Sequence, residues 1–291
     1  MTAENRRASP PRGSAERPGT SERRLPEYDH QLSAFHTVFE RELQAIVDAL
    51  PLRPDMRVLD LACGDGFYTQ RIAERLGPGG FITGADINLP YVAEARDAAR
   101  QRGHAKINFV VAPFDHLPFR DDTFDFVWCA QSLYSLPDPV VAIKHMARVL
   151  RPGGIVAVLE NDTMHQVFLP WPVGLELPLR WAELRSFLEG SGNSGKYYVG
   201  RRLPAVLAAG GLEPLRMTTH AFDRQAPLAH AEKELLQSYL EEVAKRVAPY
   251  LDAALLAELR QLVDSQSPRR LLTQPHLTMT WLTALAFGRK A

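Results

Sequence analysis

The sequence contains few cysteines, no long apolar run and no excess of either charge. Only Cys63 and Cys129 occur among the 291 residues, too few for a disulfide framework or a structural zinc site. No run of about eighteen apolar residues is present to form a membrane-spanning helix, and the N-terminus lacks the apolar core of a signal peptide. We therefore expect a protein of the reducing cytoplasm, with no membrane span.

The charges of the chain cancel. There are 34 lysines and arginines and 34 acidic residues, so the net charge is zero. Proteins that bind nucleic acid usually carry a basic excess, because neutralising phosphates supplies much of their affinity. The balance therefore favours a small-molecule partner and no nucleic acid. No cluster of histidine and acidic residues indicates a metal site, and the composition carries no signal for an oligomeric state.

Residues 1–25 are rich in proline, glycine, serine and arginine and contain almost no large apolar residue. Such a segment cannot bury enough surface to offset the entropy lost on ordering. We expect a disordered, solvated tail, although its arginines leave contact with an acidic partner open.

The rest of the chain alternates between strand and helix patterns. Apolar residues recur at helical spacing over residues 28–50, which predicts an amphipathic helix that ends at Pro51 and Pro54. Near-continuous apolar stretches then predict buried strands, and amphipathic stretches between them predict helices. The expected strands are 56–62, 81–86, 107–112, 124–131 and 154–160, and the expected helices are 67–76, 89–103 and 138–150.

This alternation predicts an α/β fold, a Rossmann-like, doubly wound and mostly parallel sheet with helices on both faces. A helix at 201–212 and two long strands at 214–222 and 277–290 complete it, and the amphipathic helices at about 228–268 form a helical lid inserted between the last two strands. We divide the chain into three parts and expect the third to hold substrate-side inserts at about 161–195 and 228–268. The parts are the tail 1–25, an N-terminal helix with the cofactor-binding half at 26–160, and the rest of the same domain at 161–291.

The stretch "VLDLACGDG" joins the first strand to its helix. Gly64 and Gly66 let the backbone turn sharply and approach a ligand. A dinucleotide fingerprint, G-x-G-x-x-G, would need a third glycine where Thr69 stands. Asp60, at the end of the strand, would repel a pyrophosphate and attract an ammonium or a sulfonium. S-adenosylmethionine carries both cations and no phosphate, so we prefer it to NAD.

Asp86 ends the second strand, where an acid commonly bonds the ribose hydroxyls of a bound nucleoside. Both NAD and S-adenosylmethionine have that ribose, so Asp86 does not discriminate between them. Each acid also has a plain structural interpretation, Asp60 as a cap of a turn or helix and Asp86 as the N-cap of the next helix. Their joint position, at the ends of two successive strands beside a glycine loop, favours the functional interpretation.

These residues belong to an ordered set of motifs: "VLDLACGDG", "GADI", "LPFRDDTFDFV", "LYSLPDP" and "VLRPGG". The set resembles the class I S-adenosylmethionine-dependent methyltransferases, particularly the group with ubiquinone/menaquinone-biosynthesis enzymes and many natural-product methyltransferases. The resemblance covers residues 52–160 well and 200–222 and 277–290 more loosely. It implies a methyltransferase with S-adenosyl-L-methionine as cofactor and S-adenosyl-L-homocysteine as product.

The resemblance also implies the cofactor site. Asp60, Gly64 and Gly66 would hold the methionine moiety, with Ala62 and Cys63 in the same loop. Asp86 would take the ribose hydroxyls, Ile87 would pack on adenine, and the backbone of Ala130 would lie near the amino group. The family usually has an acid for the adenine amine where this chain has Pro113. Phe114 or Asp115 is expected to serve instead, and our hypothesis is that Asp115 binds the amine.

Methyl transfer from a sulfonium is an in-line displacement that depends on proximity, and it needs a base only if the acceptor loses a proton. Three candidate catalytic residues follow strands four and five: Tyr134, where relatives often carry histidine, and His165 with Asp162 to orient it. A histidine without a chemical role remains the alternative for His165. We expect aromatic residues of the 161–195 insert and after it to shape a pocket for a small, partly apolar acceptor. They are Phe168, Trp171, Trp181, Tyr197 and Tyr198.

Three other functions stay open at this point. They are a methyltransferase of RNA or protein, a protein that binds S-adenosylmethionine without transferring methyl, and an NAD(P)-dependent oxidoreductase. Asp60 and Thr69 count against the last, and the neutral charge weakens the RNA version. The sequence does not identify the acceptor or the atom, O, N or C, that is methylated.

Overall fold

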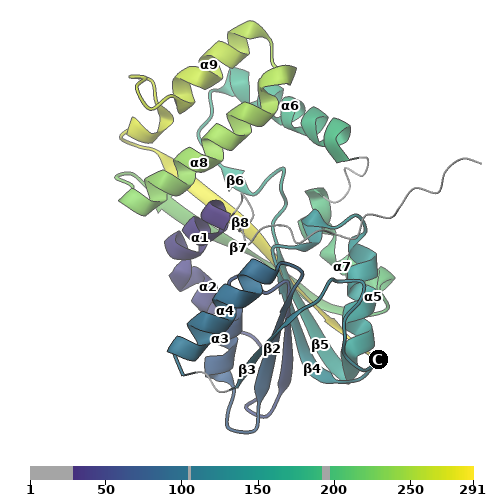
Figure 1. Ribbon diagram of the computed structural model, residues 1–291. Helices are drawn as coiled ribbons and strands as arrows, with labels where there is room; N and C mark the ends of the chain where they lie inside the picture. Colours follow the sequence, from purple (N-terminus) through teal and green to yellow (C-terminus); the bar gives the residue numbers. More distant parts are fainter. Residues whose placement is uncertain (1–28, 104–105, 192–196) are drawn as a thin grey trace, which may run out of the picture.

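The computed structural model describes residues 29–103, 106–191 and 197–291; the expected tail, 1–25, lies outside them. Within this part of the chain, one sheet has the strand order β3-β2-β1-β4-β5-β8-β6, with β7 paired to β8 (Figure 1). Strands β1 to β5 are parallel, whereas β8 is antiparallel to its neighbours. The strands are β1 Arg57–Leu61, β2 Phe81–Asp86, β3 Ile107–Val111, β4 Phe124–Ala130, β5 Leu150–Glu160, β6 Val167–Phe168, β7 Glu213–Gln225 and β8 Thr278–Arg289.

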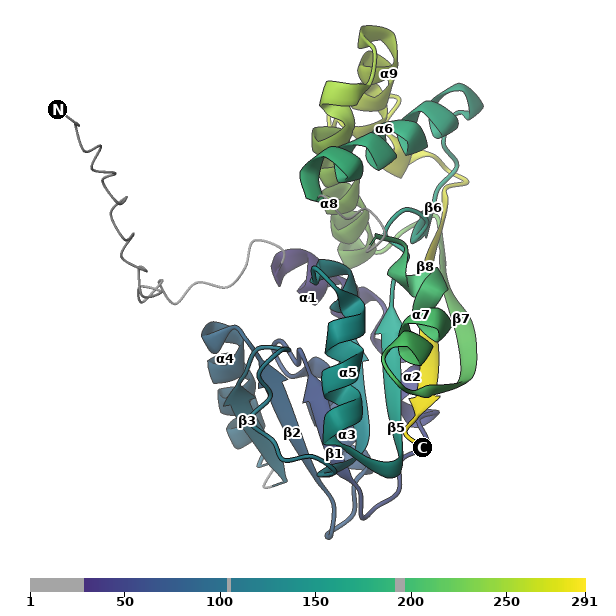
Figure 2. The same ribbon diagram turned by 90° about the vertical axis from the view of Figure 1, so that its right-hand side faces the viewer.

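Helices cover both faces of this sheet, as expected. Figure 2 shows α5 and α7 on the near face, while α2 and α3 pack on the other. Neighbouring residues of β1 alternate between the two cores, Val58 in one and Leu59 in the other, because side chains along a strand point to opposite faces. The helices are α1 Asp29–Val38, α2 Glu40–Asp48, α3 Phe67–Arg75, α4 Leu89–Gln101, α5 Pro139–Val149, α6 Val173–Ser191, α7 Val199–Ala209, α8 His230–Val247 and α9 Ala253–Val263.

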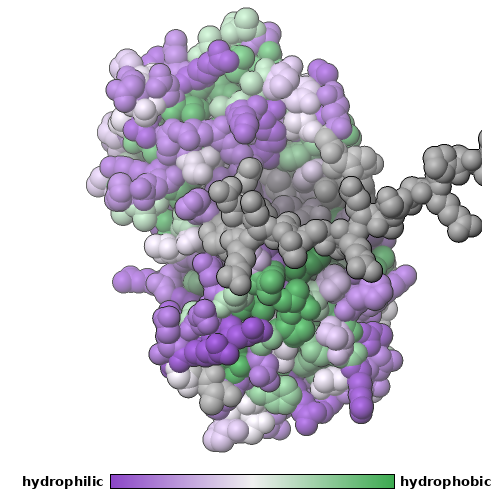
Figure 3. Space-filling model, viewed as in Figure 1, coloured by the Kyte–Doolittle hydropathy of each residue, from purple (hydrophilic) through white to green (hydrophobic). Residues whose placement is uncertain are grey.

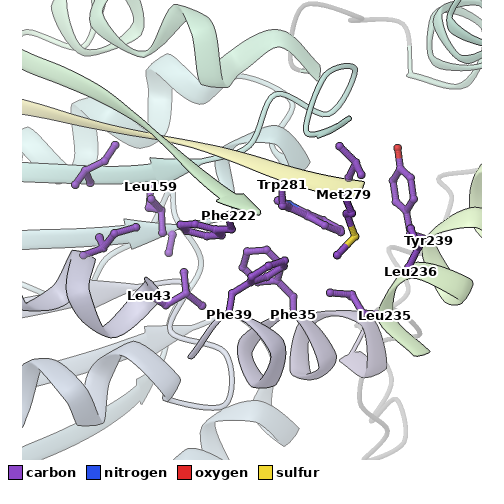
Figure 4. Close-up of a cluster of buried hydrophobic side chains, with 14 of the residues drawn as sticks. Phe35, Phe39, Leu43, Leu159, Phe222, Leu235, Leu236, Tyr239, Met279 and Trp281 are labelled. Carbon is purple, nitrogen blue, oxygen red and sulfur yellow. The ribbon is translucent and has the colours of Figure 1, made fainter. Parts of the chain in front are cut away.

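The first predicted helix, 28–50, is in fact two helices that meet at Phe39. The Phe39 side chain is fully buried, 5.1 Å from the Phe35 ring and 5.2 Å from the Phe222 ring of β7 (Figure 4). The guanidinium of Arg224, also on β7, donates to the Val38 carbonyl at the end of α1 (2.7 Å). Packing and capping by a distant strand therefore end α1 here, which helical spacing alone does not reveal.

Helix α6 was not predicted, because the 161–195 segment contains Pro178 and Gly174 and has no clear amphipathic period. Its buried residues face α8 and α9, and its opposite side leaves Val173, Leu177 and Trp181 exposed. Helices α6, α8 and α9 gather at one end of the molecule, beyond the parallel half of the sheet (Figures 1 and 2). Helices α8 and α9 do lie between the last two strands; their action as a lid remains a prediction.

We predict that Phe39→Ala lowers the free energy of unfolding by about 3–5 kcal/mol, the usual cost of an emptied aromatic site. The loss should appear in urea unfolding followed by circular dichroism. The matched control is Phe168→Ala, whose ring is half exposed and whose removal should cost less than about 1 kcal/mol. Equal losses for the two variants would contradict the account of the α1–α2 junction.

Candidate cofactor site

The glycine loop connects β1 to α3 through three residues in the left-handed region. Their φ angles are 60° at Ala62, 51° at Gly64 and 81° at Gly66. A Cβ on Gly66 would also lie 3.1 Å from the Cβ of Ala95 on α4, so glycine is needed there for two reasons. Ala62 adopts a conformation that costs an ordinary residue about 1 kcal/mol or more. The fold therefore holds strain where the chain bends over the cavity.

Asp86 fastens this loop to the end of β2. One carboxylate oxygen accepts the Gly64 N–H (3.0 Å) and the other accepts the Asn88 N–H (2.8 Å). Asn88 is the N-cap of α4, so Asp86 is not the cap that the structural interpretation proposed. Burial raises the pKa of the Asp86 carboxyl. Each oxygen keeps a lone pair for a ligand hydroxyl.

A cavity of about 450 Å³ opens beside the loop. Eight of the ten predicted cofactor residues line it: Ala62, Cys63, Gly64, Asp86, Ile87, Phe114, Asp115 and Ala130. Ile87 is 68% exposed at its rim, so its apolar side chain is open to contact with a ligand. Together with Leu89 and Val141, at the first turns of α4 and α5, it leaves apolar surface on the face where Figure 3 shows hydrophobic side chains gathered between these helices.

The two remaining residues, Asp60 and Gly66, do not line the cavity. Asp60 is buried beneath the loop and accepts a hydrogen bond from the Thr69 hydroxyl (2.5 Å). Burial raises its pKa to about 7, and the Thr69 hydrogen bond opposes that shift. Asp60 is thus placed beneath the cavity lining and Gly66 in the turn that leads into α3, and the cofactor roles of both residues stay predictions.

Glu160, at the end of β5, is a site residue that the sequence analysis missed. One of its buried oxygens accepts N–H groups from Ser132, Leu133 and Tyr134 at 3.0, 2.8 and 3.4 Å, and the other accepts the Asn161 N–H at 3.0 Å. Burial raises the Glu160 pKa to about 7, against the pull of these N–H groups. The signal was available, because Glu160 ends a buried strand as Asp60 and Asp86 do.

Of the predicted catalytic residues, Tyr134 lines the cavity, whereas Asp162 and His165 line no described cavity. Arg201 contacts both residues of that pair: it forms an ion pair with Asp162 and lies 2.7 Å from His165 Nδ1, while Asp162 is 3.7 Å from that nitrogen. Asp162 therefore contacts both Arg201 and His165, and its role in orienting His165 stays a prediction. The spacing along the chain suggested their pairing but carried no information about Arg201.

A second cavity, of about 310 Å³, meets the first at Leu32, Gln131 and Tyr134. Its remaining apolar lining comes from the N-terminal helix, the β8 strand and the helical end of the molecule: Phe35, Phe187, Tyr197, Leu235, Tyr239 and Trp281. Of the five predicted pocket aromatics, only Tyr197 lines it, stacked on Phe187 with ring centroids 4.0 Å apart. Phe168 of β6 faces solvent and Trp171, before α6, is in the core. Trp181 faces solvent because it lies on the outer side of α6.

The chemistry of the first cavity fits S-adenosylmethionine. Its described lining includes Asp65, Asp86, Asp115 and Asp138 but no lysine or arginine. This arrangement suits a sulfonium and an ammonium and disfavours a pyrophosphate. Within the described residues, no group of three or more histidine, cysteine or acidic side chains is placed to hold a metal ion. Nor is any helix of that part long and apolar enough to cross a membrane.

Comparisons with known proteins agree with this geometry. Residues 52–184 match the family model of a methyltransferase domain. The ubiquinone/menaquinone biosynthesis C-methyltransferase UbiE of Idiomarina loihiensis is 38% identical over 128 residues, 42% of this chain and 51% of that protein. Methyltransferase GfsG of Streptomyces halstedii is 34% identical over 122 residues, 42% and 43% of the two chains. The chain thus spans about half the length of the curated relatives it matches.

Solved structures match over a longer stretch. A methyltransferase structure from Bacillus halodurans aligns with a TM-score of 0.56 at 16% identity, over 85% of this chain and 98% of that one. The YcgJ protein of Bacillus subtilis aligns at 0.54 and 17%, over 86% and 98%. At such identities the likeness concerns the fold alone. The family model identifies residues 52–184 as a methyltransferase domain, and the motifs and the cavity agree with a class I methyltransferase that uses S-adenosylmethionine.

Proposed function

We propose that this protein transfers a methyl group from S-adenosylmethionine to a small, partly apolar organic acceptor. The observation that carries the proposal is the junction of the two cavities at Gln131 and Tyr134. At this junction the first cavity, whose acids suit the cofactor, adjoins the second cavity, whose lining includes many aromatic and aliphatic side chains. Relatives named as C-methyltransferases of ubiquinone and menaquinone biosynthesis are consistent with a small acceptor.

The chain's own residues would hold the cofactor by distinct contacts. Asp86 would accept the ribose hydroxyls while it keeps Gly64 in place, and the exposed Ile87 would pack on adenine. Asp115, whose side chain is 64% exposed at the rim, would bind the adenine amine in place of the acid missing at Pro113. The Ala130 backbone would face the amino group.

When bound, the cofactor supplies a methyl group on a positively charged sulfur, ready for in-line displacement. The protein's part is alignment and exclusion of water, because proximity accounts for much of the rate of such reactions. Glu160 fixes the backbone of Ser132, Leu133 and Tyr134, and so fixes the wall between donor and acceptor. Tyr134 is better placed than His165 to contact the acceptor, and a base is needed only for acceptors that lose a proton.

We predict that Asp86→Asn weakens S-adenosylmethionine binding at least about 10-fold, because an amide loses one acceptor oxygen for the loop or the ribose. Calorimetric titration would measure this. Asp97→Asn on the exposed side of α4 is the matched control and should bind as the wild type does. If the wild-type protein binds NADH and does not bind S-adenosylmethionine, the proposed function is wrong.

The raised pKa of Asp60 predicts a pH dependence. A cationic ligand favours the ionised carboxylate, so affinity for S-adenosylmethionine should rise as pH increases through about 7. We expect the affinity ratio of wild type to Asp60→Asn to grow about 3- to 10-fold between roughly pH 6 and 8. The folding stability of the free protein depends on pH in the opposite direction. The raised pKa of Asp60 in the folded state adds stability at pH values below the pKa of Asp60 in the unfolded chain, and this stability is lost as pH rises through about 7. A pH-independent ratio would contradict the role of Asp60.

We predict that Tyr134→Ala lowers methyl transfer about 10- to 100-fold with little change in cofactor affinity, because the junction loses a wall that aligns the acceptor. His165→Ala should stay within about 2-fold of wild type. Formation of S-adenosylhomocysteine with a panel of small apolar acceptors would measure both. A larger loss in His165→Ala than in Tyr134→Ala would reverse the assignment.

A further inference from the structure

His36 is a buried polar residue whose position is explained neither by the packing of the fold nor by the contacts of the predicted cofactor residues. It lies on α1 and is only 6% exposed, with its ring stacked on Phe67 at 3.9 Å and edge-on to Tyr68 at 5.4 Å. The ring lines the cofactor cavity and also the adjoining groove between α1, α3 and α4. The stacked contact with Phe67 and the edge contact with Tyr68 together fix its orientation.

Neither nitrogen of this imidazole has a hydrogen-bond partner within the described chain. Burial, helped by the Arg71 charge, lowers the His36 pKa to about 3, so the ring is neutral and offers one N–H donor and one acceptor. The Gln131 side chain opposes that shift as a weak hydrogen-bond partner, but the contact falls outside hydrogen-bond geometry, and its Oε1 and both ring nitrogens stay unpaired. Buried polar atoms are seldom left unpaired without a reason.

Two more unpaired polar atoms belong to side chains that line the same cavity, the Tyr68 hydroxyl and the Gln131 carbonyl oxygen Oε1. Both are buried, and Tyr68 is in edge contact with the His36 ring. One part of the cavity is therefore surrounded by three polar side chains: the His36 imidazole on α1, the Tyr68 hydroxyl on α3 and the Gln131 amide after β4. A polar ligand group is the natural partner for such a set.

The two ends of the cavity identify that group. Asp86, Ile87 and Asp115 stand at the ends of β2 and β3, where adenosine is expected, so the amino-acid end of the cofactor extends toward Ala130 and His36. That end carries an ammonium and a carboxylate. The acids of the lining can serve the ammonium, but no lysine or arginine of the described lining serves the carboxylate.

We propose that His36 and Tyr68 donate an N–H and an O–H bond to the carboxylate of the cofactor's amino-acid end, so that α1 forms part of the cofactor site. The proposal rests on the proposed function, since it requires an adenosyl cofactor in this cavity. Arg71 supports it at longer range: its guanidinium stacks on Phe67, 3.6 Å from the ring centroid, behind the imidazole.

The test compares two ligands that differ at the amino-acid end. S-adenosylhomocysteine has the carboxylate, whereas 5′-methylthioadenosine has the same adenosine and sulfur without it. In calorimetric titrations, His36→Phe keeps the ring stacking but removes both nitrogens. It should weaken S-adenosylhomocysteine about 10-fold or more and leave methylthioadenosine within about 2-fold. Tyr68→Phe should show the same pattern, and His36→Gln, which keeps a donor, should recover part of the loss.

The controls separate this proposal from the proposed function. His230→Phe, at an exposed histidine of α8, should leave both affinities unchanged. If wild type binds neither ligand, the proposed function fails. If wild type binds both but His36→Phe weakens both equally, or neither, only the carboxylate contact is wrong.

A spectroscopic readout covers the case in which His36→Phe fails to fold. In wild type labelled with ¹⁵N at histidine, the His36 ring should show a neutral tautomer. Its protonated nitrogen should shift when S-adenosylhomocysteine is added and stay in place with methylthioadenosine. The same shift with both ligands, or with neither, would overturn the proposal.

Discussion

Buried carboxylates that hold backbone N–H groups shape the ligand-binding edge of this sheet. Asp86 accepts N–H groups from Gly64 and Asn88, and Glu160 accepts four from residues 132–134 and 161. Without these acceptors, loops at the ends of β1, β4 and β5 would leave polar backbone unpaired in a buried setting, which costs about 1–3 kcal/mol per group. The glycine loop and the wall between the cavities both depend on them.

The same carboxylates set the electrostatics. Asp60, Asp86 and Glu160 are buried, and burial raises the pKa of each. A ligand that brings positive charge to this edge relieves that cost, whereas a pyrophosphate would add to it. The second cavity differs in charge: beside its aromatic and aliphatic side chains its lining holds one acid, Glu242, which is bonded to Arg246. This contrast supports a cationic donor in one cavity and a largely apolar acceptor in the other.

Local patterns predicted the parallel half of the fold well, because buried strands and amphipathic helices leave a clear period. The glycine loop and Asp86 were also predictable, since both follow directly from where strands end. Contacts between distant segments were not. Phe39 breaks a helix because it packs on β7, Arg201 contacts both Asp162 and His165, and α6 presents Trp181 to solvent. His36 falls within the predicted helix, where spacing shows burial but not an unpaired ring.

The most direct test of the account is a crystal structure with S-adenosylhomocysteine bound. The account predicts the ribose hydroxyls on Asp86, adenine against Ile87, and the sulfur at the junction of the two cavities beside Gln131 and Tyr134. A sulfur directed away from that junction, or a ligand bound outside the cavity beside the glycine loop, would contradict it.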